Sequence, residues 1–259
     1  MDRLTLPELK GQPLAGRTLL ITGAAGTLGK VAACACAAAG GRLVLLDQDV
    51  AGLEALRDEI LTQQPDAELG LLPMDLASAE PEHYLKLTEI LRSYTSSLHG
   101  LVHNAAHLDF LEPLACLSPK RWFVSLQVNL NAPFLLTRAC LPLLNASGEA
   151  SVVFTSDSTA RLAPAYWGAY AVAKTGVETL ARILAAEWEA RGSLRANILV
   201  PGKVATSTRR RAFPGEAEES LTSPQSLAKL YVYLLSSASR GQSGYTYFHQ
   251  DEQHVLRAR

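Results

Sequence analysis

Tyr170 and Lys174 are the two residues whose types and spacing most directly suggest chemistry. Four residues apart on a helix, they share one face, so the ammonium can lie within a few ångströms of the phenol. A free phenol titrates with a pKa of ~10, and a neighbouring cation favours the phenolate and lowers that pKa. The pair can therefore hold and move a proton, although Tyr and Lys at this spacing also occur as an ordinary surface pair.

The chain around this pair alternates short apolar runs with longer periodic segments. We expect strands at 17–22, 43–46, 69–72, 100–103, 152–155, 195–200 and 245–248, and helices at 28–39, 50–62, 82–94, 118–144, 167–190 and 223–235. This alternation predicts an α/β fold, a doubly wound, Rossmann-type three-layer sandwich in which helices cover both faces of a parallel sheet of about seven strands. Chemistry is expected beyond the carboxyl ends of the strands, where ligands bind in such sheets.

Length, composition and charge limit the classes of protein. The sequence has 259 residues, 48% of them hydrophobic, and a formal net charge of −1. We expect one domain over 1–259 with a sizeable core, and neither a nucleic-acid nor a membrane partner. The four cysteines lack metal-site spacing, so no metal site is predicted. Without a leader-like or membrane-length apolar run, the expected location is the cytoplasm.

A glycine-rich segment, Thr22-Gly23-Ala24-Ala25-Gly26-Thr27-Leu28-Gly29, follows the first of these strands and opens a helix. Glycines in this context let the backbone approach a pyrophosphate, whose charge faces the helix N-terminus. An ordinary glycine turn is the alternative. The strand-to-helix context favours nucleotide binding.

Asp47 stands at the end of the next strand, where a carboxylate can accept both hydrogen bonds of an adenosine ribose diol. A 2'-phosphate would meet like charge there, and the following residues are Gln48 and Asp49 rather than an arginine. NAD is therefore the preferred cofactor, with NADP possible. The alternative is that Asp47 caps the next helix.

Taken together, the motifs resemble the short-chain dehydrogenase/reductase family over 14–248. In family order they are the glycine segment at 22–29, Asp75-Leu76, His103-Asn104-Ala105-Ala106, Val128-Asn129-Leu130, Tyr170 with Lys174, and 201–206. Within the family, the blocks at 154–156, 167–170 and 211–214 are most similar to the bacterial YciK-type oxidoreductases, which are uncharacterised.

The resemblance implies an NAD(P)-dependent oxidoreductase that interconverts an alcohol and a carbonyl of a small-molecule substrate. Tyr170 would be the acid/base, Lys174 would lower its pKa and bind the nicotinamide ribose, and Asn129 would hold the helix backbone that carries a proton-relay water. The implied cofactor-binding residues are Gly23, Gly26, Thr27, Leu28, Gly29, Asp47, Asp75, Leu76, Asn104, Ala105, Tyr170, Lys174, Pro201, Gly202, Val204 and Thr206. Of these, Asp75 would meet the adenine and Asn104 would lie near the adenosine ribose.

The sequence departs from the family pattern in the glycine segment, at Ala106 and at the substrate-binding serine. Thr27 occupies the place of the middle glycine, and Ala106 that of the last glycine of N-N-A-G, both mild changes. The serine expected thirteen residues before Tyr170 is Asp157, with Ser156 and Ser158 on either side. An ionised carboxylate only accepts hydrogen bonds, opposes a developing oxyanion and disfavours the Tyr170 phenolate.

Several consequences of Asp157 stay open. A protonated Asp157 would donate as serine does, and an ionised one would accept from an alcohol or pair with a cationic substrate such as an amino alcohol. Ser156 or Ser158 would replace it after a loop shift, although strand alternation argues against this. Otherwise the protein is catalytically impaired and acts as a dinucleotide-binding or sensor protein.

The segment 207–221 follows the last predicted cofactor motif, where the family places a mobile substrate lid. Its arginine run, 209–211, either attracts an acidic or phosphorylated substrate or is a solvated loop surface, and we favour the latter. Tyr166 and Trp167 either line an apolar pocket or pack at the start of the helix. Family analogy and the apolar helices at 118–144 and 167–190 predict a homodimer or homotetramer.

Overall fold

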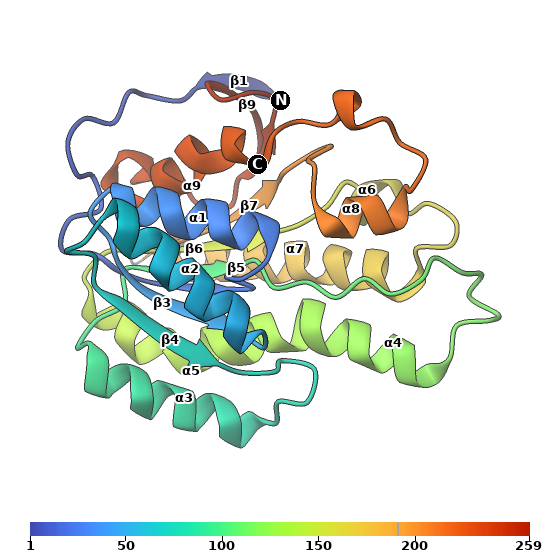
Figure 1. Cartoon of the computed structure of the whole chain (residues 1–259), viewed down its shortest axis with the longest axis horizontal. Coiled ribbons are helices and arrows are strands. Elements are labelled where there is room, and N and C mark those ends of the chain that lie inside the picture. Colours follow the sequence, from blue (N-terminus) through green and yellow to red (C-terminus); the bar gives the residue numbers. More distant parts are fainter. Residues whose placement is uncertain (191) are drawn as a thin grey trace.

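A mostly parallel sheet forms the middle layer of the computed structural model, which describes residues 1–190 and 192–259 (Figure 1). Its strands are β1 (Asp2–Thr5), β2 (Thr18–Thr22), β3 (Arg42–Asp47), β4 (Leu69–Pro73), β5 (Gly100–His103), β6 (Ala150–Thr155), β7 (Leu194–Val200), β8 (Thr246–His249) and β9 (His254–Ala258). They lie in the order β1-β9-β8-β7-β6-β5-β2-β3-β4. Strands β2 to β8 pair in parallel, whereas β9 is antiparallel to both β8 and β1.

Helices cover both faces of this sheet. They are α1 (Thr27–Ala38), α2 (Val50–Gln63), α3 (Pro81–Tyr94), α4 (Pro119–Leu126), α5 (Ala132–Ala146), α6 (Thr159–Leu162), α7 (Gly168–Glu189), α8 (Ser207–Ala212) and α9 (Ala228–Leu235). Shorter segments are a π-helix, η1 (Gln127–Asn131), and the 3-10 turns η2 (Glu218–Ser220), η3 (Pro224–Leu227) and η4 (Ser237–Ser239). Within the described ranges, no helix combines the length and apolar character needed to cross a membrane.

The two faces are built from alternate residues of the same strands. In β2, Leu19 and Ile21 pack with α1, α2 and α9, whereas Leu20 packs with α3, α5 and α7. Since every inner strand is buried on both faces, its sequence is an apolar run rather than an alternating pattern. The predicted doubly wound, three-layer fold is confirmed.

The predicted strand count was too low, because the part of the chain that the structure describes forms nine strands rather than about seven. The two missed strands are the edge pair β1 and β9. Both are short, and β1 is mostly exposed and contains Asp2 and Arg3, so neither has the apolar run that marks the inner strands. Their pairing joins the two ends of the chain, which no local pattern indicates.

The helix predicted over 118–144 is interrupted. Ser118 caps its start as expected, by accepting a hydrogen bond from the Arg121 N–H, but the coil widens into the π-helix η1. The Asn129 side-chain amide donates to the Ser125 carbonyl (2.9 Å), and Pro133 has no N–H for the Asn129 carbonyl four residues before it. Both features disturb the regular backbone hydrogen bonds of the helix at Asn129. Such π-bulges often mark functional sites.

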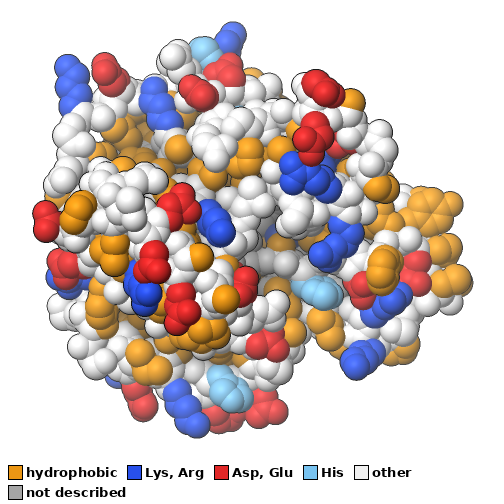
Figure 2. Space-filling model, viewed as in Figure 1, with side chains coloured by type: hydrophobic (Ala, Val, Ile, Leu, Met, Phe, Trp, Pro, Cys, Tyr) orange, Lys and Arg blue, Asp and Glu red, His pale blue; other side chains and the backbone are white. Residues whose placement is uncertain are grey.

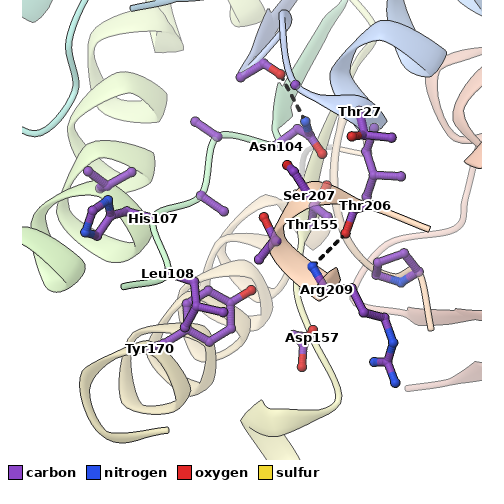
Figure 3. Close-up of a pocket in the computed structure, with 18 of the residues that line it drawn as sticks. Thr27, Asn104, His107, Leu108, Thr155, Asp157, Tyr170, Thr206, Ser207 and Arg209 are labelled. Carbon is purple, nitrogen blue, oxygen red and sulfur yellow. Dashed lines mark hydrogen bonds between the residues drawn. The ribbon is translucent and has the colours of Figure 1, made fainter. Parts of the chain in front are cut away.

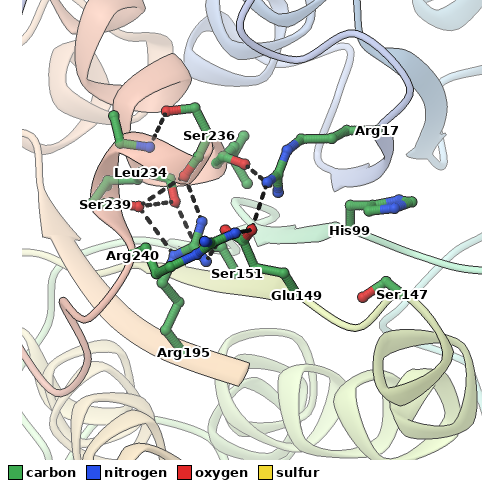
Figure 4. Close-up of polar contacts among 12 residues, drawn as sticks. Arg17, His99, Ser147, Glu149, Ser151, Arg195, Leu234, Ser236, Ser239 and Arg240 are labelled. Carbon is green, nitrogen blue, oxygen red and sulfur yellow. Dashed lines mark hydrogen bonds and ion pairs between the residues drawn. The ribbon is translucent and has the colours of Figure 1, made fainter. Parts of the chain in front are cut away.

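At the amino ends of the inner strands, three arginines surround one carboxylate (Figure 4). Glu149 pairs with Arg17 (3.0 Å), Arg195 (2.8 Å) and Arg240. The Arg195 guanidinium also donates to the Ser236 carbonyl (2.6 Å). The cluster therefore ties β2, β6 and β7 to the segment after α9, on the edge of the sheet opposite the carboxyl ends.

Glu149 is held in its charged form. Burial alone raises the pKa of its carboxyl, but the hydrogen bond from Arg240 and the charges of Arg17 and Arg195 outweigh burial and lower the pKa from 4.5 to about 2. Because this folded-state pKa lies below the unfolded value, the stabilisation is complete above pH ~4.5 and is lost as the pH falls toward 2.

Glu149→Ala should lower the free energy of unfolding at pH 7 by about 2–4 kcal/mol, because three guanidiniums lose a largely buried partner. Urea denaturation measures the change, and the difference from the native chain should shrink between pH 4.5 and pH 2. Glu89→Ala, on the exposed face of α3, serves as the control and should change stability by less than about 0.5 kcal/mol. Equal losses in the two variants would contradict the assignment.

Candidate active site

The Thr22 hydroxyl joins the carboxyl ends of β2 and β5. It donates to the Val102 carbonyl (3.2 Å) and accepts from the backbone N–H groups of Asn104 (3.0 Å) and Ala105 (3.1 Å). The chain leaves β2 toward α1 on one face and leaves β5 toward the helices of the other face, so a cleft opens between the two connections (Figure 2).

The glycine segment forms one wall of this cleft at close backbone contact. Gly23 has a φ of +63°, and a Cβ there would lie 2.6 Å from the Cα of Ala105. A Cβ on Gly29 would lie 2.0 Å from the Gly23 carbonyl oxygen. Gly26, the N-cap of α1, offers no side chain to the first-turn N–H groups. The segment is therefore a backbone cradle whose donors suit an anion.

Asp47 reaches the cleft from the end of β3. Its Oδ2 accepts from the Ala25 N–H (3.0 Å), and its Oδ1 accepts from the Asp49 N–H (3.1 Å). The cap of α2 is Asp49, which accepts from the Gly52 N–H (3.0 Å). Capping therefore does not account for Asp47, which instead fixes the glycine segment and lines the cleft.

Most of the predicted cofactor residues line this one cleft. They are Gly23, Gly26, Thr27, Leu28, Asp47, Asp75, Leu76, Asn104, Ala105, Tyr170, Lys174, Pro201, Gly202, Val204 and Thr206. Gly29 lies beneath the glycine segment instead. The structure thus brings residues from six separate motifs of the sequence to one edge of the sheet.

Lys174 is buried beside Tyr170, one turn along α7. Its Nζ donates to the Thr155 carbonyl (2.8 Å) and lies 5.5 Å from the centre of the Tyr170 ring. Burial lowers the pKa of Lys174 to about 8, against the opposing charges of Asp157 and Glu178. The Thr155 hydroxyl oxygen is buried at the same place and has no hydrogen-bond partner in the described chain.

Tyr170 points its hydroxyl into the cavity (Figure 3). The expectation that Lys174 lowers its pKa is wrong for this arrangement: burial raises the pKa of Tyr170 well above its usual value, and the charge of Asp157 raises it further. The ammonium lies over the ring and is bound to a backbone carbonyl, so it does not contact the hydroxyl. The phenol is therefore neutral in the structure.

Asp157 lies on the cavity wall just beyond the end of β6. Its Oδ1 accepts from the Thr159 N–H (2.8 Å) and faces the Ser158 hydroxyl (3.5 Å). Among residues 1–190 and 192–259, no lysine, arginine or histidine lies within 4.0 Å of this carboxylate. Asp157 thus faces the cavity without an ion-pair partner in the described chain, and the Lys174 ammonium acts on its charge only from beyond 4.0 Å.

Ser156 does not replace the missing serine. Its hydroxyl donates to Glu178 Oε1 (2.6 Å), and this buried carboxylate also binds Arg161 (2.7 Å) and Arg182 (3.1 Å). Ser156 lies beside Asp157 on the cavity wall, beyond the end of β6, but its hydroxyl is bound to Glu178. Ser158 is exposed and contacts Asp157 rather than Tyr170.

Asn129 lies behind the cavity wall rather than on it. Its amide accepts from the His107 N–H (3.1 Å) and donates to the His107 carbonyl (2.8 Å). It therefore anchors the segment after β5 to the π-helix. His103, at the end of β5, is buried against Phe154 and Thr137, and burial lowers its pKa to about 3.

A family model described as short chain dehydrogenase matches residues 17–217 of the chain. The chain belongs to the short-chain dehydrogenase family. This membership agrees with the motifs found in the sequence and with the doubly wound fold.

Relatives of this dehydrogenase cover nearly its whole length. The uncharacterised oxidoreductase YciK of Escherichia coli K12 is 35% identical over 235 residues, which are 89% of this chain and 90% of that protein. A short-chain dehydrogenase from Pseudomonas syringae has a TM-score of 0.90 at 36% identity, covering 94% of this chain and 98% of its own. One from E. coli CFT073, solved with NADPH, has a TM-score of 0.88 at 34% identity, covering 93% and 99%.

The arginine run of this dehydrogenase is occupied by contacts within the protein. Arg209 forms a two-pronged pair with Glu216 (2.6 and 2.7 Å), and Arg210 pairs with Glu218 (2.9 Å). Arg211 donates to the Leu108 carbonyl across the cavity mouth (2.9 Å). These partners favour the loop-surface interpretation over an anion site.

Sequence reasoning missed part of the apolar wall opposite Asp157. Trp167 packs between Tyr170 (5.8 Å between ring centres) and Phe213 (5.7 Å), beside Leu108. The position of Leu108 directly after the 103–106 motif was the available signal. Of the two aromatics left open, Trp167 lines the cavity, whereas Tyr166 is 60% exposed.

Proposed function

We propose that this dehydrogenase interconverts an alcohol and a carbonyl with NAD or NADP as cofactor and Tyr170 as the acid/base. One observation carries the proposal: the Tyr170 hydroxyl and Lys174 share a single cleft with the glycine cradle. A proton-transfer group is thereby placed where a dinucleotide held by the cradle would end.

The residues present fit a nicotinamide dinucleotide. The cradle at 23–29 and the N-terminus of α1 would hold the diphosphate, Asp47 the adenosine ribose, and Lys174 the nicotinamide ribose. The unpartnered Thr155 hydroxyl offers a buried polar contact at the nicotinamide end. When bound, the cofactor supplies the acceptor or donor of hydride.

The protein's own groups would orient the substrate and move the proton. As a neutral phenol, Tyr170 would give its proton to the oxygen when a carbonyl is reduced. When an alcohol is oxidised, Tyr170 would first lose its own proton to solvent and then take the hydroxyl proton as the phenolate. Lys174 places a positive charge beside the ring. Trp167 and Phe213, with the segment 207–221 as a lid, would exclude water from the reacting carbon.

Tyr170→Phe should reduce turnover of alcohols or carbonyls by at least about 100-fold, because general acid–base catalysis contributes 10²–10⁴-fold. Binding of NADH should change little, since the variant keeps the ring and loses one hydroxyl. Nicotinamide absorbance measures turnover, and fluorescence titration measures binding. Turnover that survives the substitution would rule out Tyr170 as the acid/base.

The second candidate is a dinucleotide sensor with little catalysis, and the charge of Asp157 beside Tyr170 is the observation that favours it. Here the native chain would bind NADH without turning over a panel of alcohols and carbonyls. Asp157→Ser would then restore turnover, because it restores a hydroxyl donor and removes the opposing charge.

For the choice of cofactor, we propose that Asp47 favours NAD, although a related structure contains NADPH. NADH should bind the native chain at least about tenfold more tightly than NADPH, since a hydrogen bond to a charged group contributes ~1.5–3 kcal/mol. Asp47→Asn keeps one acceptor for the Ala25 N–H and should narrow this ratio. Equal affinities in the native chain, measured by fluorescence titration, would contradict the preference.

We further propose a homodimer or homotetramer built on α4, α5 and α7. These helices expose Phe123 (66%), Phe134 (48%) and Ile183 (50%), and further hydrophobic side chains gather at the right-hand edge of Figure 2, beside the segment that leads into α4. Light scattering should give two or four times the chain mass, and Phe123→Glu should lower it. Leu85→Glu, on α3, is the control. A monomeric native chain would end this proposal.

A further inference from the structure

We propose that the substrate is an amino alcohol, or the matching amino ketone, whose ammonium group pairs with Asp157 while its oxygen meets Tyr170. This inference rests on the proposed oxidoreductase function and names the substrate class of the same site. It makes Asp157 the residue that determines specificity.

The balance of charge around the cavity is the first argument. The neighbouring carboxylates are compensated, because Glu178 is bound by Arg161 and Arg182, and Glu216 by Arg209. Asp157 has only neutral donors, the backbone of Thr159 and the hydroxyl of Ser158. A ligand cation is the missing partner.

The cations that approach the cavity form no ion pair with Asp157, although the Lys174 charge acts on it from beyond 4.0 Å. The Lys174 ammonium is bound to the Thr155 carbonyl, and Arg211 donates to the Leu108 carbonyl. An anionic substrate would therefore meet the charge of Asp157 with no free guanidinium on the described wall to offset it. The same charge attracts an ammonium, which forms strong hydrogen bonds to carboxylates.

The hydrogen-bonding groups of the cavity also favour a substrate with an ammonium group. A neutral carbonyl substrate needs donors, but Ser156 is turned toward Glu178 and an ionised Asp157 only accepts. An ammonium supplies the donors that Asp157 requires. The substrate hydroxyl then needs only Tyr170.

The apolar part of the cavity wall suits an apolar substituent on such an amino alcohol. Trp167 and Phe213 pack against each other at the cavity wall with their rings tilted by 38°, with Leu108 beside Trp167. An apolar or aromatic substituent would pack on these side chains, whose faces also attract cations. The expected substrate thus joins an apolar group, a carbinol and an ammonium.

Pairing with the ammonium would also assist the reaction. In the oxidation, the carbinol C–H bond breaks and its hydrogen leaves with the electron pair to the oxidised nicotinamide, which is reduced. The O–H proton passes to Tyr170, which as the phenolate has first released its own proton to solvent, and the C=O bond forms. A cation on Asp157 offsets the negative charge that otherwise opposes ionisation of Tyr170, so recognition and proton transfer are coupled.

The test compares 2-amino-1-phenylethanol with its neutral isostere 1-phenyl-1-propanol, with NAD as oxidant. For the native chain, kcat/KM should be about 10–100-fold higher for the amine, the range expected of a charge-assisted hydrogen bond. In Asp157→Asn and Asp157→Ser this ratio should fall to about one or below. Glu89→Gln, on the exposed face of α3, removes one negative charge far from the cavity and should keep the native ratio.

The proposal is overturned if the native chain uses the neutral alcohol as well as the amine, or if the preference persists in Asp157→Asn. If the native chain uses both alcohols equally well and Tyr170→Phe abolishes that turnover, the proposed oxidoreductase function still holds. If neither alcohol is turned over, the test is the affinity for the amine, measured by calorimetry in the presence of NAD. The Tyr170→Phe, Asp157→Asn double variant should bind the amine about tenfold more weakly than the Tyr170→Phe variant does. No binding, or no such loss, also overturns it.

Discussion

The Thr22 hydroxyl is the contact on which the geometry of the cleft depends. It accepts two backbone N–H groups and donates to a carbonyl, so it fixes the end of β5 against the end of β2. The backbone at Gly23 lies so close to the backbone of Ala105 that a Cβ on Gly23 has no room. The glycine cradle and the segment after β5 consequently behave as one rigid wall, and the first turn of α1 is aimed into the cleft rather than at another part of the protein.

The other wall depends on how charges are buried along α7. Glu178 lies one turn beyond Lys174 and is buried. Two guanidiniums balance the charge of its carboxylate, and the Ser156 hydroxyl donates a hydrogen bond to it. That arrangement locks the end of β6 onto the helix and directs the side chain of Ser156 inward. Asp157, the next residue, has no comparable partner within the described structure. The contrast between two neighbouring carboxylates, one compensated and one not, separates a structural role from a role toward ligand.

Much of the fold and of the site could be predicted from the sequence because the signals are local. Apolar runs specify the inner strands, and glycines at fixed spacing after a strand specify the cradle. The edge pair β1 and β9 could not be predicted, since its partners lie at opposite ends of the chain. The break at Asn129 depends on a side chain competing with the helix ladder, which periodicity does not reveal.

The electrostatics of the site were the hardest part to predict. The spacing of Tyr170 and Lys174 correctly placed both on one helix face, but it did not show that Lys174 would bind the Thr155 carbonyl. Burial of Tyr170, which sets the direction of its pKa shift, follows in part from packing by Leu108 and Ala212, which are distant in the sequence. Spacing therefore identifies candidate groups, whereas their proton affinities need the three-dimensional structure.

The pairing of β1 with β9 also bears on biosynthesis. Asp2 lies opposite Arg257, and both ends of the chain are seen together at the top of Figure 1. The strand β1 must therefore wait for the synthesis of β9 before it gains a neighbour, and bringing together two segments so far apart in the sequence has an entropic cost. The inner strands and their helices can assemble meanwhile, so this outer edge of the sheet is expected to pair last.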